Sequence, residues 1–551
     1  MKKYAHPLLC FVFLSCSSFA QIEEKEAIDR LFLEWDKPDV PGCALGIIKD
    51  GDLIYANGYG MANLEYDIPI DKHSVFRIGS TSKQFTAACI VLLAGKGKLS
   101  MEDRLSKFFP DFPGYADNIT VRHLLNHTSG IRDYLTLSSL KGYGGDDFYE
   151  DKDIMKWLVN QQDLNFAPGS EYLYSNSGYW LLGQIVNQVA GKNMAEFAKE
   201  EIFDPLGMTE THFHNDHTKI VKNRATGYRP VGDGPYKISM TTLDMIGDGG
   251  IFTSVNDILK WDNAFYSSDV LTPDFWSAMT EQGVLNNGDT IDYAAGLFIA
   301  DHKGLKTVSH GGAFVGFRAD LIRFPEHRLS VVVFANRADA NPTGKCFQVA
   351  DIMLKDYMDD EDVSSGGENA DPVQVTEFDR DQLVGTYEVR PGIALEIRVQ
   401  NDSLNVLQKW NGSTYGIFRI QGNTFQIPGN EELKFTFSDI VEGSTSELVI
   451  LQNGRKTVGK RIPTIDPASV NMDEFVGKFY SEELDVVYEV SMKDDSLSVT
   501  VDDNEPERIT PYDKDQFSLN YMLMRFQRTG DSVTGFLLDA GRVKDLKFQK
   551  M

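Results

Sequence analysis

Ser80 and Lys83 are the two residues whose types and spacing most directly suggest catalysis. They belong to the segment Ser80-Thr81-Ser82-Lys83, which runs into the apolar stretch from Ala87 to Ala94. Residues three apart lie on one face of a helix, so the lysine amine could take the proton of the serine hydroxyl and make it a nucleophile. If the helix begins at Ser80, its N–H groups and the positive end of its dipole would stabilise negative charge that develops there.

Two later segments could complete such a site. Tyr174-Ser175-Asn176 holds a phenol and an amide two residues apart, and alternate residues of an extended segment face the same way. His310-Gly311-Gly312-Ala313 carries small residues that let a substrate approach the backbone closely. Each segment alone also fits an ordinary helix cap, turn or strand edge. The prediction of a catalytic site therefore rests on their joint occurrence.

Several histidines and cysteines raise the question of a metal site. His123 and His127 are four residues apart, but no third ligand stands near, and the zinc-protease pattern would need a glutamate at position 124. The segment from His212 to His217 contains three histidines and reads as an exposed loop. The cysteines beyond the first 20 residues are odd in number and widely spaced: Cys43, Cys89 and Cys346. We therefore expect no metal, no disulfide framework and no cofactor.

The elements that must position these residues read as a helix-flanked antiparallel sheet. Apolar runs at 43–48 and 53–59 enclose Asp50-Gly51, which is a hairpin signal. The runs 319–324 and 329–335 predict two strands that return to the same sheet. The expected fold class is α+β, with the helix after Ser80 packed on the sheet.

Beyond residue 358 the sequence changes character. Residues 359–376 are acidic and rich in Ser and Gly, as expected of a linker. Two similar units then begin at Leu383-Val384-Gly385-Thr386-Tyr387 and Phe475-Val476-Gly477-Lys478-Phe479, and their regular alternation predicts small antiparallel β-barrels. The predicted domains are a signal peptide, a catalytic domain, a linker and two β-barrels: 1–20, 21–358, 359–376, 377–466 and 467–551.

The first 20 residues and the overall charge predict an exported protein. Two lysines, a short apolar core and Ser18-Phe19-Ala20 form a cleavable signal, and the apolar run is far shorter than the roughly 20 residues a bilayer requires. A lipid anchor at Cys16 is the alternative to free release into the periplasm or medium. The net charge of −27, from 54 basic and 81 acidic residues, argues against a nucleic-acid partner. The oligomeric state stays open.

In their order, the three segments resemble the penicillin-recognising serine hydrolases, over about residues 28–356. The similarity is greatest to the branch of class C β-lactamases, D-aminopeptidases, DD-peptidases and related esterases. The resemblance implies that Ser80 is the acylated nucleophile, that Lys83 helps to deprotonate it, and that Tyr174 is the general acid/base. It also implies that Asn176 binds the substrate amide and that the N–H groups of Ser80 and Ala313 form the oxyanion hole.

The third segment departs from the family pattern, and this departure bears on the substrate. β-Lactamases usually carry Lys-Thr-Gly there, whereas this chain has His310, whose unperturbed pKa of ~6.5 leaves it mostly neutral at pH 7. The attraction for a substrate carboxylate is thereby weakened, and D-aminopeptidases are similar in their His-x-Gly motif and their two β-barrel domains. We expect hydrolysis of amide bonds in D-amino-acid-containing peptides. The alternatives are a β-lactamase or carboxylesterase, or an acylated sensor that does not turn over.

Overall fold

The computed structural model describes residues 24–358 except 146 and 233, and residues 381–551 except 401, 411, 439, 442–443, 453–454, 464, 466–468 and 503. The predicted signal and linker lie outside the described residues. Two compact units are present, Met1–Asp103 with Tyr179–Asp360, and Arg104–Gly178 with Glu361–Met551. Among the described helices, none is long and apolar enough to cross a membrane.

The first unit is built on a six-stranded antiparallel sheet. Its strands, in spatial order, are β10 (Phe298–His302), β11 (Leu305–Phe314), β12 (Phe317–Phe324), β13 (Leu329–Ala335), β1 (Cys43–Lys49) and β2 (Asp52–Tyr59). The β1–β2 hairpin turns at Asp50 and Gly51, whose φ angles of 52° and 94° are those an Asp-Gly turn supplies. The predicted hairpin and the returning strands are confirmed.

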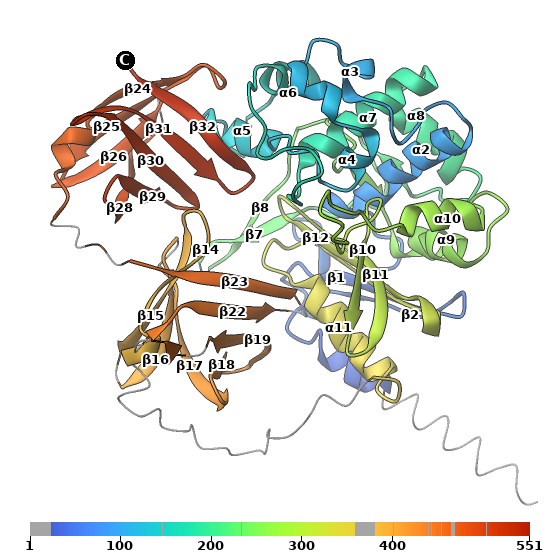
Figure 1. Ribbon diagram of the computed structural model, residues 1–551. Coiled ribbons are helices and arrows are strands. Elements are labelled where there is room, and N and C mark those ends of the chain that lie inside the picture. Colours follow the sequence, from blue (N-terminus) through green and yellow to red (C-terminus); the bar gives the residue numbers. More distant parts are fainter. Residues whose placement is uncertain are drawn as a thin grey trace, which may run out of the picture. The chain divides into compact units, whose positions relative to one another are not determined.

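Helices cover both faces of this sheet, which makes three layers (Figure 1). Helix α11 (Pro342–Met353) and residues 24–30, also helical, share a core with alternate residues of β1 such as Leu45 and Ile47. On the opposite face α9 (Val255–Tyr266) approaches so closely that a Cβ at Gly46 would lie 2.4 Å from Val255 Cγ1. Successive residues of β1 therefore face opposite sides of the sheet, and each side is covered by its own helical layer.

The helix after Ser80 begins three residues later than the sequence predicts. Residues Gly79–Ser82 form a 3₁₀ turn, and α2 runs from Lys83 to Gly95. Gly79 has φ +51°, and a Cβ there would lie 2.8 Å from Ala313 N. The turn must tighten because its backbone passes directly against β11. Ser80 is therefore held just before the helix rather than as its first residue.

Smaller elements complete the first unit. They are β3 (Met61–Asn63), β4 (Ile68–Pro69), β5 (Phe76–Arg77), β6 (His212–Phe213), β7 (Tyr228–Pro230), β8 (Tyr236–Ile238), β9 (Ile251–Thr253), α8 (Met194–Ala198) and α10 (Pro273–Thr280). Helix α7 (Asn176–Ala190) contains the boundary between the two units. Of these elements, the small sheet β5-β9-β6 matters most for the site, because β5 leads into the Ser80 turn.

The second unit joins the short helices after residue 104 to two β domains. The helices are α3 (Leu105–Phe108), α4 (Val121–Leu125), α5 (Tyr134–Leu140) and α6 (Asp151–Val159). Thr120 caps α4, and His123 completes the capping box. The sequence places residues 104–178 within a catalytic domain, whereas by contacts they cluster with the C-terminal strands.

The first β domain is a closed eight-stranded antiparallel barrel and the second a nearly closed nine-stranded sheet. The barrel strands are β14 (Gly385–Arg390), β15 (Ile393–Gln400), β16 (Ser403–Gln408), β17 (Thr414–Gln421), β18 (Thr424–Ile427), β19 (Asn430–Phe437), β22 (Glu447–Gln452) and β23 (Arg455–Ile462). The second sheet comprises β24 (Gly477–Ser481), β25 (Val486–Lys493), β26 (Ser496–Val501), β27 (Glu507–Arg508), β28 (Thr510–Asp513), β29 (Gln516–Leu519), β30 (Met522–Thr529), β31 (Ser532–Ala540) and β32 (Val543–Lys550). The predicted fold class is confirmed.

Candidate active site

Ser80 presents a hydroxyl group on a stretch that is otherwise inaccessible. Between Ser74 and Val91, every residue other than Ser80 is buried. Ile78 N donates to Ile251 O at 3.1 Å, and this bond fixes the chain entering the turn to β9. A nucleophile must be rigidly held yet reachable by substrate, and the Ser80 turn meets both conditions.

Lys83 lies beside this hydroxyl. Its side chain is completely buried, and its Nζ atom donates to Ser80 Oγ at 3.2 Å and to Asp248 O at 2.6 Å. Nζ also lies 5.5 Å from the ring centroid of Tyr179. The amine thus stands within hydrogen-bonding reach of the hydroxyl proton.

The loop before β9 holds this pair in place, a role that the sequence analysis missed. The Asp248 carbonyl accepts from Lys83 Nζ, as described above. In addition, Gly247 O accepts from Thr86 Oγ1 at 2.6 Å, and Ile251 N donates to Ser82 Oγ at 3.0 Å. Gly247 and Gly250 have φ angles of +116° and +95°, which glycine adopts without strain. The run Gly-Asp-Gly-Gly was the available signal for a backbone that must approach another segment closely.

The third segment lies in β11, against the Ser80 turn. Thr81 Oγ1 donates to His310 O at 2.9 Å, and a Cβ at Gly312 would lie 1.9 Å from Ile78 O. Only glycine fits at position 312 without displacing the turn. Ala313 is exposed, and its N atom lies against Gly79. The structure thus brings the predicted residues Ser80, Lys83 and the 310–313 segment together within the first unit.

The side chain of His310 is turned into the protein. It is 2% exposed, its Nδ1 lies 2.6 Å from Gly311 O and its Nε2 lies 3.0 Å from the Tyr293 hydroxyl. A carbonyl oxygen can only accept, so Nδ1 carries a proton and donates to Gly311 O, while the Tyr293 hydroxyl is the partner of Nε2. Both ring nitrogens therefore have partners within the protein.

Tyr174 and Asn176 belong to the second unit, where His127 and Asp133 hold their backbone. Ser175 N donates to His127 Nδ1 at 3.1 Å, and Asn176 N donates to Asp133 Oδ2 at 2.7 Å. The rings of His127 and Tyr174 have centroids 4.2 Å apart. His127 has a left-handed backbone, with φ 57°, and this conformation directs the His127 ring toward residues 174 and 175.

The histidines of the 212–217 segment serve local packing. His212 Nε2 lies 3.2 Å from His214 Nδ1, and His217 Nδ1 lies 2.9 Å from Asp244 Oδ2. Burial lowers the pKa of both His212 and His214 from 6.5 to about 4. Within the described residues, no group of three or more His, Cys, Asp or Glu side chains is arranged to hold a metal ion.

Comparison with known proteins decides the family. Residues 28–345 match the family described as Beta-lactamase. The chain belongs to the beta-lactamase family. Among relatives in this family, "Penicillin-binding protein 4*" of Bacillus subtilis is 30% identical over 65% of this chain and 81% of that protein. A D-aminopeptidase of Gluconobacter oxydans is 27% identical over 54% of this chain and 56% of its own length.

The chain is also similar in fold to solved structures. A penicillin-binding protein homologue from Pyrococcus abyssi, described as octameric, has a TM-score of 0.55 at 23% identity and covers 88% of this chain and 98% of its own. This likeness concerns the fold. The family match identifies the chain as a serine hydrolase of the beta-lactamase family, and the chain carries additional C-terminal β domains.

Proposed function

We propose that this serine hydrolase cleaves amide bonds of D-amino-acid-containing peptides through an acyl-enzyme at Ser80. One observation carries the proposal, the 3.2 Å contact between Nζ of the buried Lys83 and Oγ of the partly exposed Ser80. Support for the substrate class comes from the D-aminopeptidase relatives and from a buried His310 where β-lactamases usually carry a lysine. The predicted signal at 1–20 supports export, as a free or lipid-anchored protein.

In the proposed reaction, Ser80 Oγ attacks the carbonyl carbon of the substrate amide while its proton passes to Lys83. The new bond makes a tetrahedral oxyanion, which the N–H groups of Ser80 and Ala313 stabilise. Tyr174 delivers a proton to the leaving nitrogen, the C–N bond breaks, and the acyl group stays on Ser80. Water then releases the acid by the reverse proton path. Asn176 orients the substrate amide.

A substrate comparison tests this proposal. The purified protein is assayed with the p-nitroanilides of D-alanine and L-alanine, a chromogenic cephalosporin and p-nitrophenyl acetate. We expect the highest kcat/KM among the amides and lactams for the D-alanine derivative, and loss of all activities in Ser80→Ala. Faster hydrolysis of the cephalosporin would favour a β-lactamase, and ester hydrolysis alone would favour a carboxylesterase. Lasting acylation without turnover would indicate the sensor.

A further inference from the structure

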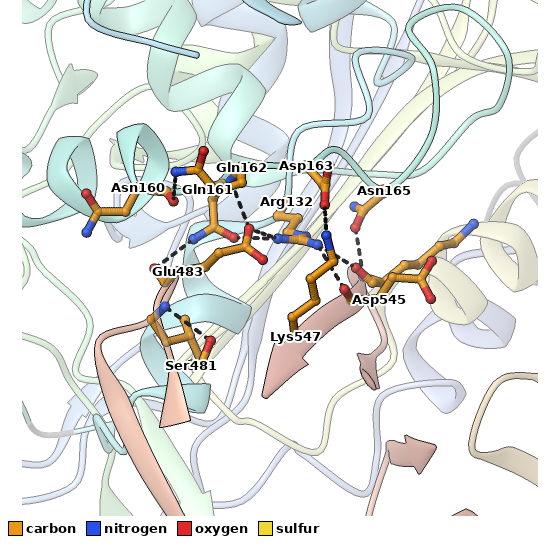
Figure 2. A network of polar contacts seen from close by, with 12 residues as sticks. Arg132, Asn160, Gln161, Gln162, Asp163, Asn165, Ser481, Glu483, Asp545 and Lys547 are labelled. Atoms are coloured by element: carbon orange, nitrogen blue, oxygen red, sulfur yellow. Dashed lines mark hydrogen bonds and ion pairs between the residues drawn. The ribbon is translucent and has the colours of Figure 1, made fainter. Parts of the chain in front are cut away.

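The C-terminal sheet is anchored to the segment that carries Tyr174 by a buried polar network (Figure 2). Arg132, whose side chain is 0% exposed, donates to Glu483 Oε2 at 2.5 Å and to Gln161 Oε1 at 2.9 Å. Arg132 also donates to Lys544 O at 3.0 Å. A buried guanidinium requires such partners. The network therefore holds the C-terminal sheet in one position against residues 104–178.

The turn between β31 and β32 is clamped next to this network. Asn165 Nδ2 donates to Arg542 O at 2.9 Å, and Lys544 N donates to Asn165 Oδ1 at 2.7 Å. Asp133 N also donates to Arg542 O, at 3.4 Å. With its backbone held from both sides, the turn presents the Arg542 side chain in a defined direction.

That side chain reaches Tyr174. The Arg542 guanidinium carbon lies 4.7 Å from the centroid of the Tyr174 ring, and its Nη1 lies 3.6 Å from Asp133 Oδ2. Asp133 is the same carboxylate that accepts the Asn176 N–H. Within this unit the His127 ring also packs against Tyr174, and Asp133 forms an ion pair with Arg542.

We propose that Arg542 is a positioning residue for Tyr174, so that the C-terminal sheet contributes to the proton transfers of the reaction. This inference rests on the proposed role of Tyr174. A cation on an aromatic face is attracted to it and restricts the ring, and a nearby positive charge favours the phenolate that must form when Tyr174 gives up its proton. Both effects are lost when the charge is removed.

A matched variant separates this role from the general loss of a positive charge. Lys544 lies two residues away on the same hairpin, and its Nζ pairs with Glu171 Oε2 at 2.9 Å. Arg542→Met and Lys544→Met therefore remove the same charge from the same hairpin, but only the first removes the contact with Tyr174. Arg542→Lys keeps the charge and should recover part of any loss.

The experiment measures hydrolysis of p-nitrophenyl acetate by the full chain, so that it does not depend on the preference for D-residues. We expect Arg542→Met to lower kcat about tenfold with KM within about twofold, Arg542→Lys to lie between, and Lys544→Met to stay within about twofold of wild type. Thermal unfolding of each variant shows whether the fold is kept. If Arg542→Met does not fold, the comparison of Arg542→Lys with Lys544→Met carries the test.

A double-mutant cycle with Tyr174→Phe gives the decisive readout. If Arg542 acts through the tyrosine, Arg542→Met should have no further effect on kcat for p-nitrophenyl acetate in the Tyr174→Phe background, because that turnover includes the proton transfers of deacylation. An equal loss in both backgrounds would overturn the proposal. An increase in KM at unchanged kcat in Arg542→Met would also overturn it, because Arg542 would then contact the substrate rather than position Tyr174. If Ser80→Ala alone left ester hydrolysis intact, the proposed function would have failed instead.

Discussion

The Nζ atom of Lys83 lies 3.2 Å from the Oγ atom of Ser80, and the lysine side chain has no exposed surface. A buried amine is costly to keep charged unless it is well partnered, and here its partners include the Asp248 carbonyl. This geometry fits the proposed transfer of the Ser80 proton to Lys83. This relationship is the basis of the first prediction.

Replacing Lys83 with methionine should abolish most activity while keeping the fold. Methionine has a similar length and suits a buried site, so packing is largely preserved. Without the amine, we expect kcat/KM for p-nitrophenyl acetate to fall by about 10²–10⁴-fold, the usual contribution of a general acid/base. Circular dichroism and thermal unfolding serve as the control for folding. Activity within about threefold of wild type would contradict the assigned role.

Gly312→Ala should damage the site much more than Gly311→Ala. A Cβ at position 312 would lie 1.9 Å from Ile78 O, while at position 311 the nearest atom would be Asp320 Oδ2 at 3.2 Å. Relief of the first clash must move β11 away from the Ser80 turn, and a displacement near 1 Å costs on the order of 10² in rate. We expect this loss in kcat for Gly312→Ala, with a lower melting temperature. Equal kinetics for the two variants would show that the close approach is unimportant.

Breaking the Arg132–Glu483 pair should destabilise the second unit. Both side chains are nearly inaccessible, at 0% and 5% exposure. Removing one partner leaves the other charge buried, which costs about 3–5 kcal/mol. Glu483→Gln should therefore lower the midpoint of urea unfolding, and the double variant Arg132→Met/Glu483→Met should recover part of the loss. The prediction is wrong if the double variant is as unstable as the sum of the two single variants.

Acidification should destabilise the protein in part through His212 and His214. Burial lowers the pKa of each histidine to about 4 in the folded state, against 6.5 for the unfolded chain. Between these values the unfolded chain binds more protons, so the stabilising contribution is complete above pH 6.5 and is lost as the pH falls toward 4. The double variant His212→Asn/His214→Asn should show a shallower loss of unfolding free energy over this range. Identical slopes for variant and wild type would contradict the assignment.

The sequence predicts much of this architecture because several signals are local. The Asp50-Gly51 turn, the apolar strands and the β repeat each depend on neighbouring residues. Phe425 and Phe517 occupy equivalent positions in the two repeated units. They lie in β18 and β29, and both are buried. The order of the three candidate segments was also sufficient to predict the family.

Other features depend on contacts between residues far apart in the chain, which leave little local signal. The contact of Arg132 with Glu483 spans 351 positions, and it helps to explain why residues 104–178 cluster with the C-terminal strands. The later start of α2 follows from the close approach of Gly79 to Ala313. Arg542 likewise stands in no recognisable motif.

Intact-mass analysis of the protein after reaction with a fluorophosphonate probe tests the central claim most directly. We expect one adduct per chain, located by peptide mapping to Ser80, and no adduct in Ser80→Ala. Lys83→Met should be labelled far more slowly than wild type. Labelling of Ser80→Ala at the wild-type rate, or an adduct mapped to another residue, would contradict the account.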